Sequence, residues 1–142
     1  MMEKKLGYFA APLFSDAEKC YNELIVNKLE AELSNIEFFL PQRDGILLDS
    51  SDDKNEAKKR IFYLDELKIF HCDFMVAILD GAHIDEGVAI EIGIAYSLNK
   101  RIIALSTDPR RQTPDGFNPM VENCISKFCY SVSELSNFLS QL

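Results

Sequence analysis

The stretch "FMVAIL", residues 74–79, is the clearest strand signal in this chain of 142 residues. Every position in it is apolar, whereas a strand with one face in water alternates apolar and polar residues. A continuous apolar run of this length is typical of a strand that is covered on both faces. Helices cover both faces of the sheet in parallel α/β proteins, so the stretch predicts a central strand of a parallel sheet.

Further strands and helices alternate on both sides of this central strand. Shorter apolar runs predict strands at residues 5–11, 36–41, 101–107 and 127–130. Helical periodicity and two capping-box pairs, Ser15 with Glu18 and Ser131 with Glu134, predict helices at residues 15–34, 55–70, 85–99 and 131–142. This alternation predicts one α/β domain over residues 1–142, a doubly wound parallel sheet of about five strands flanked by helices, flavodoxin-like or Rossmann-like.

Two segments lack periodicity and are predicted to be loops. "QRDGILLDSSDD", residues 42–53, is too irregular for a helix or a strand, and its length and polarity would let it act as a lid. "DPRRQTPDGFNPM", residues 108–120, is interrupted by proline and glycine and should connect the last two strands.

Composition and charge exclude several classes of protein. The formal net charge is -8, and the densest basic group, "KNEAKKR" at residues 54–60, reads as a solvated helix face. A nucleic-acid binder would normally present a basic face, so we expect no nucleic-acid partner. No apolar run approaches the roughly 20 residues of a membrane span. The N-terminal segment also lacks the pattern of a signal peptide, so we expect a cytoplasmic protein with no membrane partner.

Cysteine and histidine residues do not have the spacing of a metal site. The cysteines form no C-x-x-C motif and lie within apolar segments, which predicts buried free thiols in a reducing compartment: Cys20, Cys72, Cys124 and Cys129. Neither His71 nor His83 is spaced to share a metal with them or to activate one of them as a nucleophile. We therefore expect no metal and no cofactor.

The ligand site is expected at the carboxyl ends of the strands, where doubly wound sheets bind their ligands. The chain has no G-x-G-x-x-G motif and no P-loop lysine, which disfavours a dinucleotide or a nucleoside triphosphate. Acids are frequent near these strand ends instead. The topology places Tyr8, Asp65, Asp85 and Glu91 near one end of the sheet.

Glu91 is the most unusual of these residues. It lies in "DEGVAIEIGIAY", residues 85–96, and its neighbours one helical turn away are all small or apolar. Burying an ionised carboxylate without partners is costly, so Glu91 is either a stray acid favoured by the helix dipole or a functional group. In the second interpretation, Gly93 lets the helix pack close to the sheet. The wall that keeps the site dry is then formed by nearby isoleucines, Ile90, Ile92 and Ile94.

The other three residues each have a structural alternative. Asp65 could be a surface acid at the edge of an apolar stripe, which consists of Ile61, Phe62, Leu64, Leu67, Ile69 and Phe70. Asp85 could be a helix N-cap, and Tyr8 could be a plain core residue. As a group with Glu91, they suit the cleavage of a glycosidic bond. In that chemistry one carboxylate attacks the anomeric carbon and a second acid protonates the leaving group.

Four segments resemble the nucleoside 2'-deoxyribosyltransferase family. "YFAAPLFSDAE" (residues 8–18), "RDG" (43–45) and "FNPM" (117–120) are similar to its first strand and loop, its second-strand loop and its late loop. The most specific part is the central block at residues 65–100. It contains the D-x-G-x-x-x-E-x-G-type pattern as "DEGVAIEIG", in which Glu86 separates Asp85 from Gly87.

The resemblance implies transfer of 2'-deoxyribose between nucleobases on 2'-deoxyribonucleosides, with Glu91 as the nucleophile that forms a covalent ester. Tyr8 would hydrogen-bond Glu91, and Asp65 would handle the proton of the base. The substrate-binding residues would be Asp85 at the 5' end of the sugar, Gly87 in the same pattern, Gln42 at the base, and Asn118 and Met120 from a neighbouring subunit. The resemblance thus implies a homo-oligomer with shared active sites. The ending "LSNFLSQL" predicts a packed helix, so the role of a terminal carboxylate in an adjacent site is not carried over.

Two alternatives remain beside the transferase. A hydrolase would use the same covalent intermediate with water as the acceptor, on deoxynucleosides or deoxynucleotides. A remote alternative is a non-catalytic, flavodoxin-like nucleotide-binding module, which the acids at the strand ends disfavour. Asp85 would repel a 5'-phosphate, which favours nucleosides over nucleotides. The pattern does not distinguish purine from pyrimidine substrates.

Overall fold

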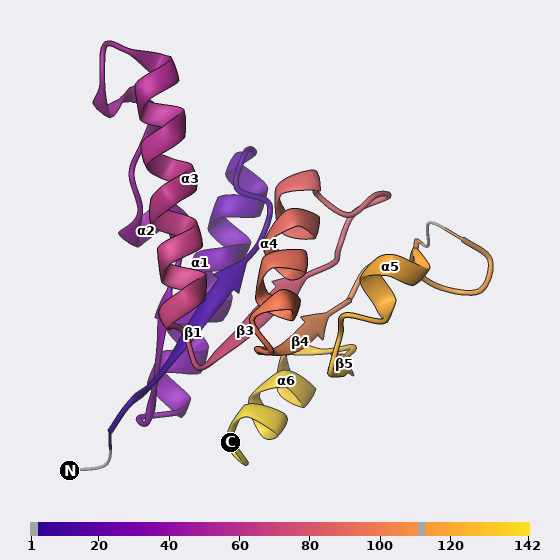
Figure 1. The fold of residues 1–142 in the computed structure, drawn as a ribbon. Coiled ribbons are helices and arrows are strands. Elements are labelled where there is room, and N and C mark those ends of the chain that lie inside the picture. The colour runs from indigo at the N-terminus through magenta and orange to yellow at the C-terminus, as the bar shows by residue number, and fades with distance from the viewer. Residues whose placement is uncertain (1–2, 111–112) are drawn as a thin grey trace.

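Five parallel strands form the central sheet in the order β2-β1-β3-β4-β5, in a computed structural model that describes residues 3–110 and 113–142 (Figure 1). The strands are β1 (Lys5–Ala10), β2 (Ile36–Phe39), β3 (Phe74–Ile78), β4 (Arg101–Leu105) and β5 (Lys127–Cys129). The "FMVAIL" stretch supplies β3, which pairs with β1 and β4 and is buried at every position. The prediction of a central, doubly covered strand is confirmed.

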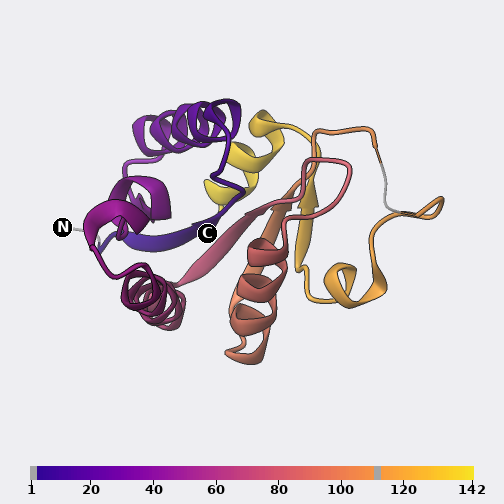
Figure 2. The same cartoon turned by 90° about the horizontal axis from the view of Figure 1, so that it is seen from above.

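Helices cover both faces of this sheet, as the view from above shows (Figure 2). On one face, α1 (Asp16–Glu32) and α6 (Val132–Leu139) pack into a core with the strands. On the other face, α3 (Lys54–His71) and α4 (Glu86–Ser97) form a second core with residues such as Tyr8. The predicted fold class, a doubly wound α/β domain, is confirmed.

The two predicted capping boxes differ in the structure. At α1, the Ser15 side chain accepts the Glu18 N–H, and the Glu18 carboxylate accepts the Ser15 N–H at 2.8 Å, so the box is complete. At α6, Ser131 accepts the Glu134 N–H at 3.1 Å, but the Glu134 carboxylate accepts the N–H of Tyr130 at 2.9 Å. The second pair is therefore only half of a capping box.

The segment at residues 42–53 is more ordered than its composition indicates. It overlaps a short helix, α2 (Pro41–Asp44), and contains a 3-10 helix, η1 (Leu48–Ser50). Proline is pre-organised for the first helical position, and the Asp44 carboxylate accepts a backbone N–H just before the helix at 2.8 Å. The prediction that no helix forms here is wrong.

A short helix also interrupts the predicted loop at residues 108–120. α5 (Pro119–Glu122) begins with a proline, and the Asn118 side chain caps it by accepting the Met120 N–H at 2.9 Å. The prediction of a loop up to Met120 is wrong at this end. Residues 111–112 of the segment lie outside the described residues.

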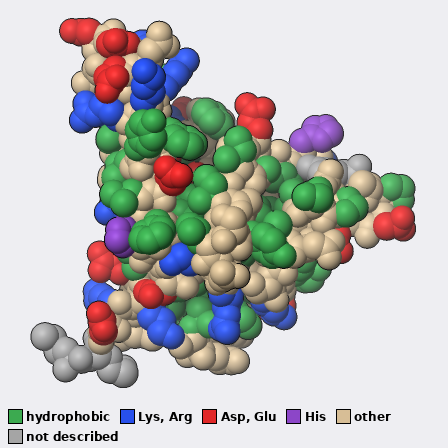
Figure 3. Space-filling model, viewed as in Figure 1, with side chains coloured by type: hydrophobic (Ala, Val, Ile, Leu, Met, Phe, Trp, Pro, Cys, Tyr) green, Lys and Arg blue, Asp and Glu red, His purple; other side chains and the backbone are tan. Residues whose placement is uncertain are grey.

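Part of the predicted apolar stripe of α3 faces outward. Ile69 is buried against the sheet, but Phe62, Leu67 and Phe70 are each more than half exposed. α4 and α5 add further exposed apolar side chains, Ile90, Tyr96 and Met120. Figure 3 shows hydrophobic side chains gathered over α3, α4 and α5 on this side of the molecule. We call this surface the α3–α4–α5 face.

Gly93 of α4 belongs to the outward side as well. A Cβ added at Gly93 would meet nothing within 4 Å, because Ile92 and Ala95 take the buried positions of the helix. The expectation that Gly93 lets α4 pack close to the sheet is wrong.

The cysteines follow the expectation only in part. Cys72 and Cys129 are buried free thiols, and Cys124 is partly buried. Cys20 is exposed, because the buried side of α1 carries other residues, Asn22, Ile25, Val26 and Leu29. Within the described ranges, no helix is long and apolar enough to cross a membrane, and no group of three or more His, Cys, Asp or Glu side chains could hold a metal ion.

Candidate active site

A cavity of about 760 Å³ opens at the carboxyl end of β1. Small-molecule sites in proteins have volumes of about 300–1,000 Å³. After β2 the chain returns past β1 to form β3, so the direction in which strands are added reverses between β1 and β3. Ligands of doubly wound sheets bind at such a switch point. The lining comes from the loop after β1 and from α1, α2, η1, α3 and α4, and includes five predicted site residues, Gln42, Asp65, Asp85, Gly87 and Glu91.

Glu91 points into this cavity and is held by Tyr8 from the centre of the sheet. The Tyr8 hydroxyl donates a hydrogen bond to Glu91 Oε1 at 2.8 Å, and the Tyr8 side chain is fully buried. Burial raises the pKa of Glu91 to about 8, with the charges of Asp65 and Asp85 adding to the rise and the Tyr8 hydrogen bond opposing it. Burial also raises the pKa of Tyr8 well above its usual range, so the phenol remains a donor. Glu91 is therefore not a stray helix acid in solvent.

Asp65 approaches the same cavity from α3. Burial raises its pKa to about 6, and its charge contributes to the raised pKa of Glu91. Two coupled carboxyls with separated pKa values can supply one carboxylate and one carboxylic acid at the same pH. Asp65 is thus part of the cavity wall and not a surface acid at the edge of a stripe.

Asp85 is the N-cap residue of α4 and also lines the cavity. Its Oδ2 atom accepts the N–H of Val88 at 3.0 Å, so the N-cap interpretation is confirmed. A Cβ at Gly87 would lie 3.0 Å from that same oxygen, closer than ordinary contacts allow. Glycine at position 87 therefore leaves the Asp85 carboxylate room to cap the helix beside the cavity.

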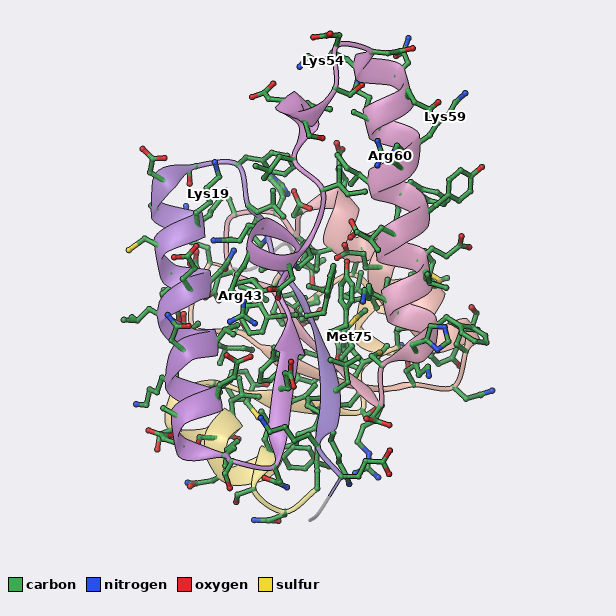
Figure 4. All side chains as sticks on the ribbon, turned by 90° about the vertical axis from the view of Figure 1, so that its left-hand side faces the viewer. Lys19, Arg43, Lys54, Lys59, Arg60 and Met75 are labelled. Carbon is green, nitrogen blue, oxygen red and sulfur yellow. The ribbon has the colours of Figure 1, made fainter. Side chains whose placement is uncertain are left out.

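Gln42 lines the cavity, but its amide is held by α1. Asn22 Nδ2 donates to Gln42 Oε1 at 2.9 Å, and Gln42 Nε2 donates to the Lys19 carbonyl at 2.9 Å. The next residue, Arg43, lies between α1 and the strands (Figure 4) and bonds to Glu30 of α1 at 3.0 Å. α2 is therefore fixed against α1, and Gln42 is a positioned part of the wall.

The structure does not bring Asn118 and Met120 to this cavity. Both lie at the start of α5, which packs against α4. The Met120 side chain is 79% exposed and belongs to the α3–α4–α5 face. Within a single chain these two residues therefore do not line the predicted site.

The apolar wall of the cavity comes from residues to which the sequence analysis gave no role in the wall. They are Leu13, Phe14, Ile46, Leu47, Leu48, Ile61 and Val88. The prediction that isoleucines of α4 form this wall is wrong: Ile92 is buried in the core, and Ile90 is 60% exposed. The apolar triplet "ILL" at residues 46–48, within an otherwise polar segment, was the available signal.

The fold and this cavity define a class of protein, doubly wound α/β proteins that hold two coupled carboxyls and a buried phenol at the ligand-binding edge of the sheet. The chain belongs to the nucleoside 2-deoxyribosyltransferase family, whose family model matches residues 8–134. This range includes every residue of the predicted site, from Tyr8 to Met120. A comparison with curated protein sequences finds no match.

Several solved structures are similar to this chain. A conserved protein from Enterococcus faecalis V583 is 30% identical, with a TM-score of 0.83 over 97% of this chain and 98% of that chain. A 2-deoxyribosyltransferase from Bacillus psychrosaccharolyticus is 20% identical, with a TM-score of 0.74 over 93% and 90% of the two chains. A CMP N-glycosidase from Clostridium botulinum is 19% identical, with a TM-score of 0.61 over 96% and 98%. At this identity the last two show a shared fold.

Proposed function

We propose that this protein exchanges the nucleobase of 2'-deoxyribonucleosides, with Glu91 as the nucleophile. Between about pH 6 and pH 8 the two carboxyls share one proton, and the reacting form carries it on Asp65 while Glu91 is ionised. In the first half-reaction, a Glu91 oxygen bonds to C1' while the bond from C1' to the base nitrogen breaks, and Asp65 gives its proton to the leaving base. In the second, a nitrogen of another base attacks C1', its proton passes to Asp65, and the Glu91 carboxylate is released. The protein's own side chains carry every proton and bond change, and no cofactor is needed.

The position of Glu91 is the observation that supports this proposal most directly. Its carboxyl lies in a cavity beside Asp65, and the hydrogen bond from Tyr8 holds one oxygen at 2.8 Å. A nucleophile that is held in place and partly shielded from water can attack C1' while few waters compete for the ester. A passive binding module would have no use for two carboxyls whose burial is costly.

The surroundings of Asp85 favour a nucleoside with a free 5'-hydroxyl. A carboxylate can accept a hydrogen bond from a hydroxyl, but it repels a phosphate in a chain whose formal net charge is already -8. We assign the 5' end of the sugar to Asp85 and the base to the wall that contains Gln42. Gly87 then forms the part of the wall between Asp85 and Glu91.

A second copy of the chain would complete the site. The α3–α4–α5 face exposes several large apolar side chains together, and such surfaces on soluble proteins mark contact sites. Asn118 and Met120 belong to the α5 part of this face. In a homo-oligomer built on this face, they would reach the cavity of a neighbouring subunit. Sedimentation tests this: an active monomer would exclude the role of Asn118 and Met120.

Incubation of the protein with a 2'-deoxyribonucleoside, with and without a different free base, tests the proposed reaction. A new deoxyribonucleoside in the second tube is the expected result. Release of free 2-deoxyribose in both tubes, with no new nucleoside, would identify a hydrolase. No consumption in either tube would leave a binding module.

A further inference from the structure

The cavity extends beyond the carboxyl pair along α3. Lys58, Ile61 and Asp65 all line it, and their spacing of three and four residues places them on one side of the helix. The seven residues from Lys58 to Asp65 correspond to a rise of about 10.5 Å along the helix. The cavity therefore has a distal end about two helical turns away from Asp65.

Lys58 of α3 lines this distal end, and three further charged side chains line the cavity away from the carboxyl pair: Asp49 from η1, and Lys19 and Glu23 from α1. Both carboxylates already accept hydrogen bonds, Asp49 from Lys54 at 3.0 Å and Glu23 from Gln42 at 3.1 Å. Among the described residues, the ammonium groups of Lys19 and Lys58 form no hydrogen bond or ion pair. The cavity thus offers two uncommitted cations, Lys58 at its distal end and Lys19 on α1.

The proposed reaction fixes the direction in which a base would lie. Glu91 and Asp85 hold the sugar, and Asp65 faces the nitrogen of the base that leaves. The base ring then occupies the apolar middle of the cavity, near Phe14 and Ile61. Its edge away from the glycosidic bond points toward Lys58.

We propose that Lys58, supported by Lys19, is a specificity-determining residue that favours nucleobases with an anionic substituent on the edge away from the glycosidic bond. This inference rests on the proposed function of the same cavity. An ammonium group is a compact charge with three donors and forms charge-assisted hydrogen bonds with a carboxylate. The acids at the catalytic end repel the same substituent, so its charge also sets the orientation of the base in the cavity.

Two acceptor bases that differ mainly in charge test the proposal: 5-carboxyuracil and its neutral amide, 5-carbamoyluracil. The measured quantity is the ratio of kcat/KM for the carboxylate to kcat/KM for the amide in base exchange. Lys58→Gln should lower this ratio about 3- to 10-fold, the range expected for one solvent-accessible charge contact. Rising salt should lower the ratio of the wild-type protein toward that of the variant.

Lys59→Gln is the matched control. It removes the same charge from the next position of α3, and Figure 4 shows Lys59 pointing away from the side of the helix that faces α1 and α2. We expect the ratio of this variant to stay within about twofold of the wild-type value. An unchanged ratio in Lys58→Gln, or an equal loss in Lys59→Gln, would overturn the role of Lys58.

Binding of the two free bases, measured by equilibrium dialysis without a nucleoside, makes the test independent of turnover. Tighter binding of 5-carboxyuracil than of the amide, weakened by Lys58→Gln, supports the inference even if exchange fails. A different outcome would remove only this inference and leave the proposed function intact. In that outcome the protein exchanges 5-carbamoyluracil, but Lys58→Gln changes neither the ratio of the two kcat/KM values nor the binding of the free bases.

Discussion

The carboxyl edge of the sheet carries two sets of acids with opposite surroundings. Beside β4, Asp80 accepts the N–H and the hydroxyl of Thr107, both at 2.6 Å, and the N–H of Asp108 at 2.9 Å. Hydrogen bonds from Arg110 hold the pKa of Asp108 well below its usual range. Beside β1, Glu91 accepts one hydrogen bond from the residues that the structure describes, that of Tyr8, and burial raises its pKa to about 8.

The two sets differ in the number of hydrogen-bond donors that reach each carboxylate, and not in the type of residue. The hydrogen bonds to Asp80 and Asp108 tie the loops after β3 and β4 together. Among the described residues only Tyr8 donates to Glu91, so burial raises the affinity of this carboxyl for a proton, and in the proposed reaction it bonds to the sugar. Perturbed carboxyls in a cavity are typical of functional sites.

Glu91→Gln should have the largest effect on activity, because an amide cannot form the ester with C1'. We expect kcat/KM for a deoxynucleoside to fall by about 10,000-fold or more. Asp80→Asn is the matched control, since the same change at the well-bonded acid should leave kcat/KM within about twofold. Near-normal turnover by a folded Glu91→Gln protein would exclude Glu91 as the nucleophile.

The same Glu91→Gln variant should be more stable than the wild type above neutral pH. The pKa of Glu91 rises from 4.5 to about 8 on folding, so the folded protein binds the proton more tightly than the unfolded chain. The resulting stabilisation is complete below pH 4.5 and is lost as the pH rises through about 8. Glutamine does not ionise, so its advantage should grow to roughly 1–3 kcal/mol at pH 9. Urea unfolding at pH 5 and pH 9 measures this, and equal differences at both values would contradict the raised pKa.

Asp65→Asn should lower kcat/KM about 100-fold, the usual range for loss of a general acid. The wild-type profile should be a bell with limbs near pH 6 and pH 8, between which the pair shares one proton. In the variant only Glu91 titrates, and its pKa falls because the charge of Asp65 no longer raises it. The pH profile should therefore become a single rising limb below pH 8. A bell that survives the substitution would assign the acid to another group.

Tyr8→Phe should lower kcat/KM about 10-fold, since one hydrogen bond to a charged group is lost. The Tyr8 bond lowers the pKa of Glu91, so its removal should shift the upper limb of the pH profile above pH 8. Tyr21→Phe, on the opposite face of the sheet, is the control and should change neither kcat/KM nor the position of the upper limb. A lower rate without a shifted limb would mean that Tyr8 acts only through packing.

Asp80→Ala tests the other side of the comparison. The three groups that donate to Asp80, the N–H and hydroxyl of Thr107 and the N–H of Asp108, would lose their acceptor. The free energy of unfolding should therefore fall by about 1–2 kcal/mol while kcat/KM changes little. Asp80→Asn keeps one acceptor oxygen and should recover part of the loss. Denaturant midpoints measure the effect. Loss of turnover in a folded Asp80→Ala protein would show that both sets of acids serve the reaction.

The sheet could be predicted from the sequence, whereas the short helices could not. β3 and β4 lie inside the sheet, so burial on both faces leaves continuous apolar runs. α2 depends on contacts with distant residues, such as the bond from Arg43 to Glu30, which no local pattern reveals. The periodicity of α3 marked apolar residues but did not separate the side that faces the sheet from the side that faces out.

The acids of the site could be predicted more readily than its walls. Glu91 and Asp65 interrupt apolar stripes, and this is visible in the sequence. The bond between Tyr8 and Glu91 spans 83 positions, so only the family resemblance indicated it. The wall at residues 46–48 lies in a segment without periodicity, where the direction of a side chain follows from tertiary contacts alone.

The first turns of α3 extend past the end of the sheet, where they rest on η1 (Figure 1). Lys58 lies on this extension, whereas Asp65 and Glu91 lie next to the sheet. Segments with little buried surface open locally at low free energy, so their amides should exchange with solvent before those of β3. Substitutions on the extension consequently cost the fold little. Under the proposed function, substitutions on the extension would alter which base the chain selects while Glu91 and Asp65 stay unchanged.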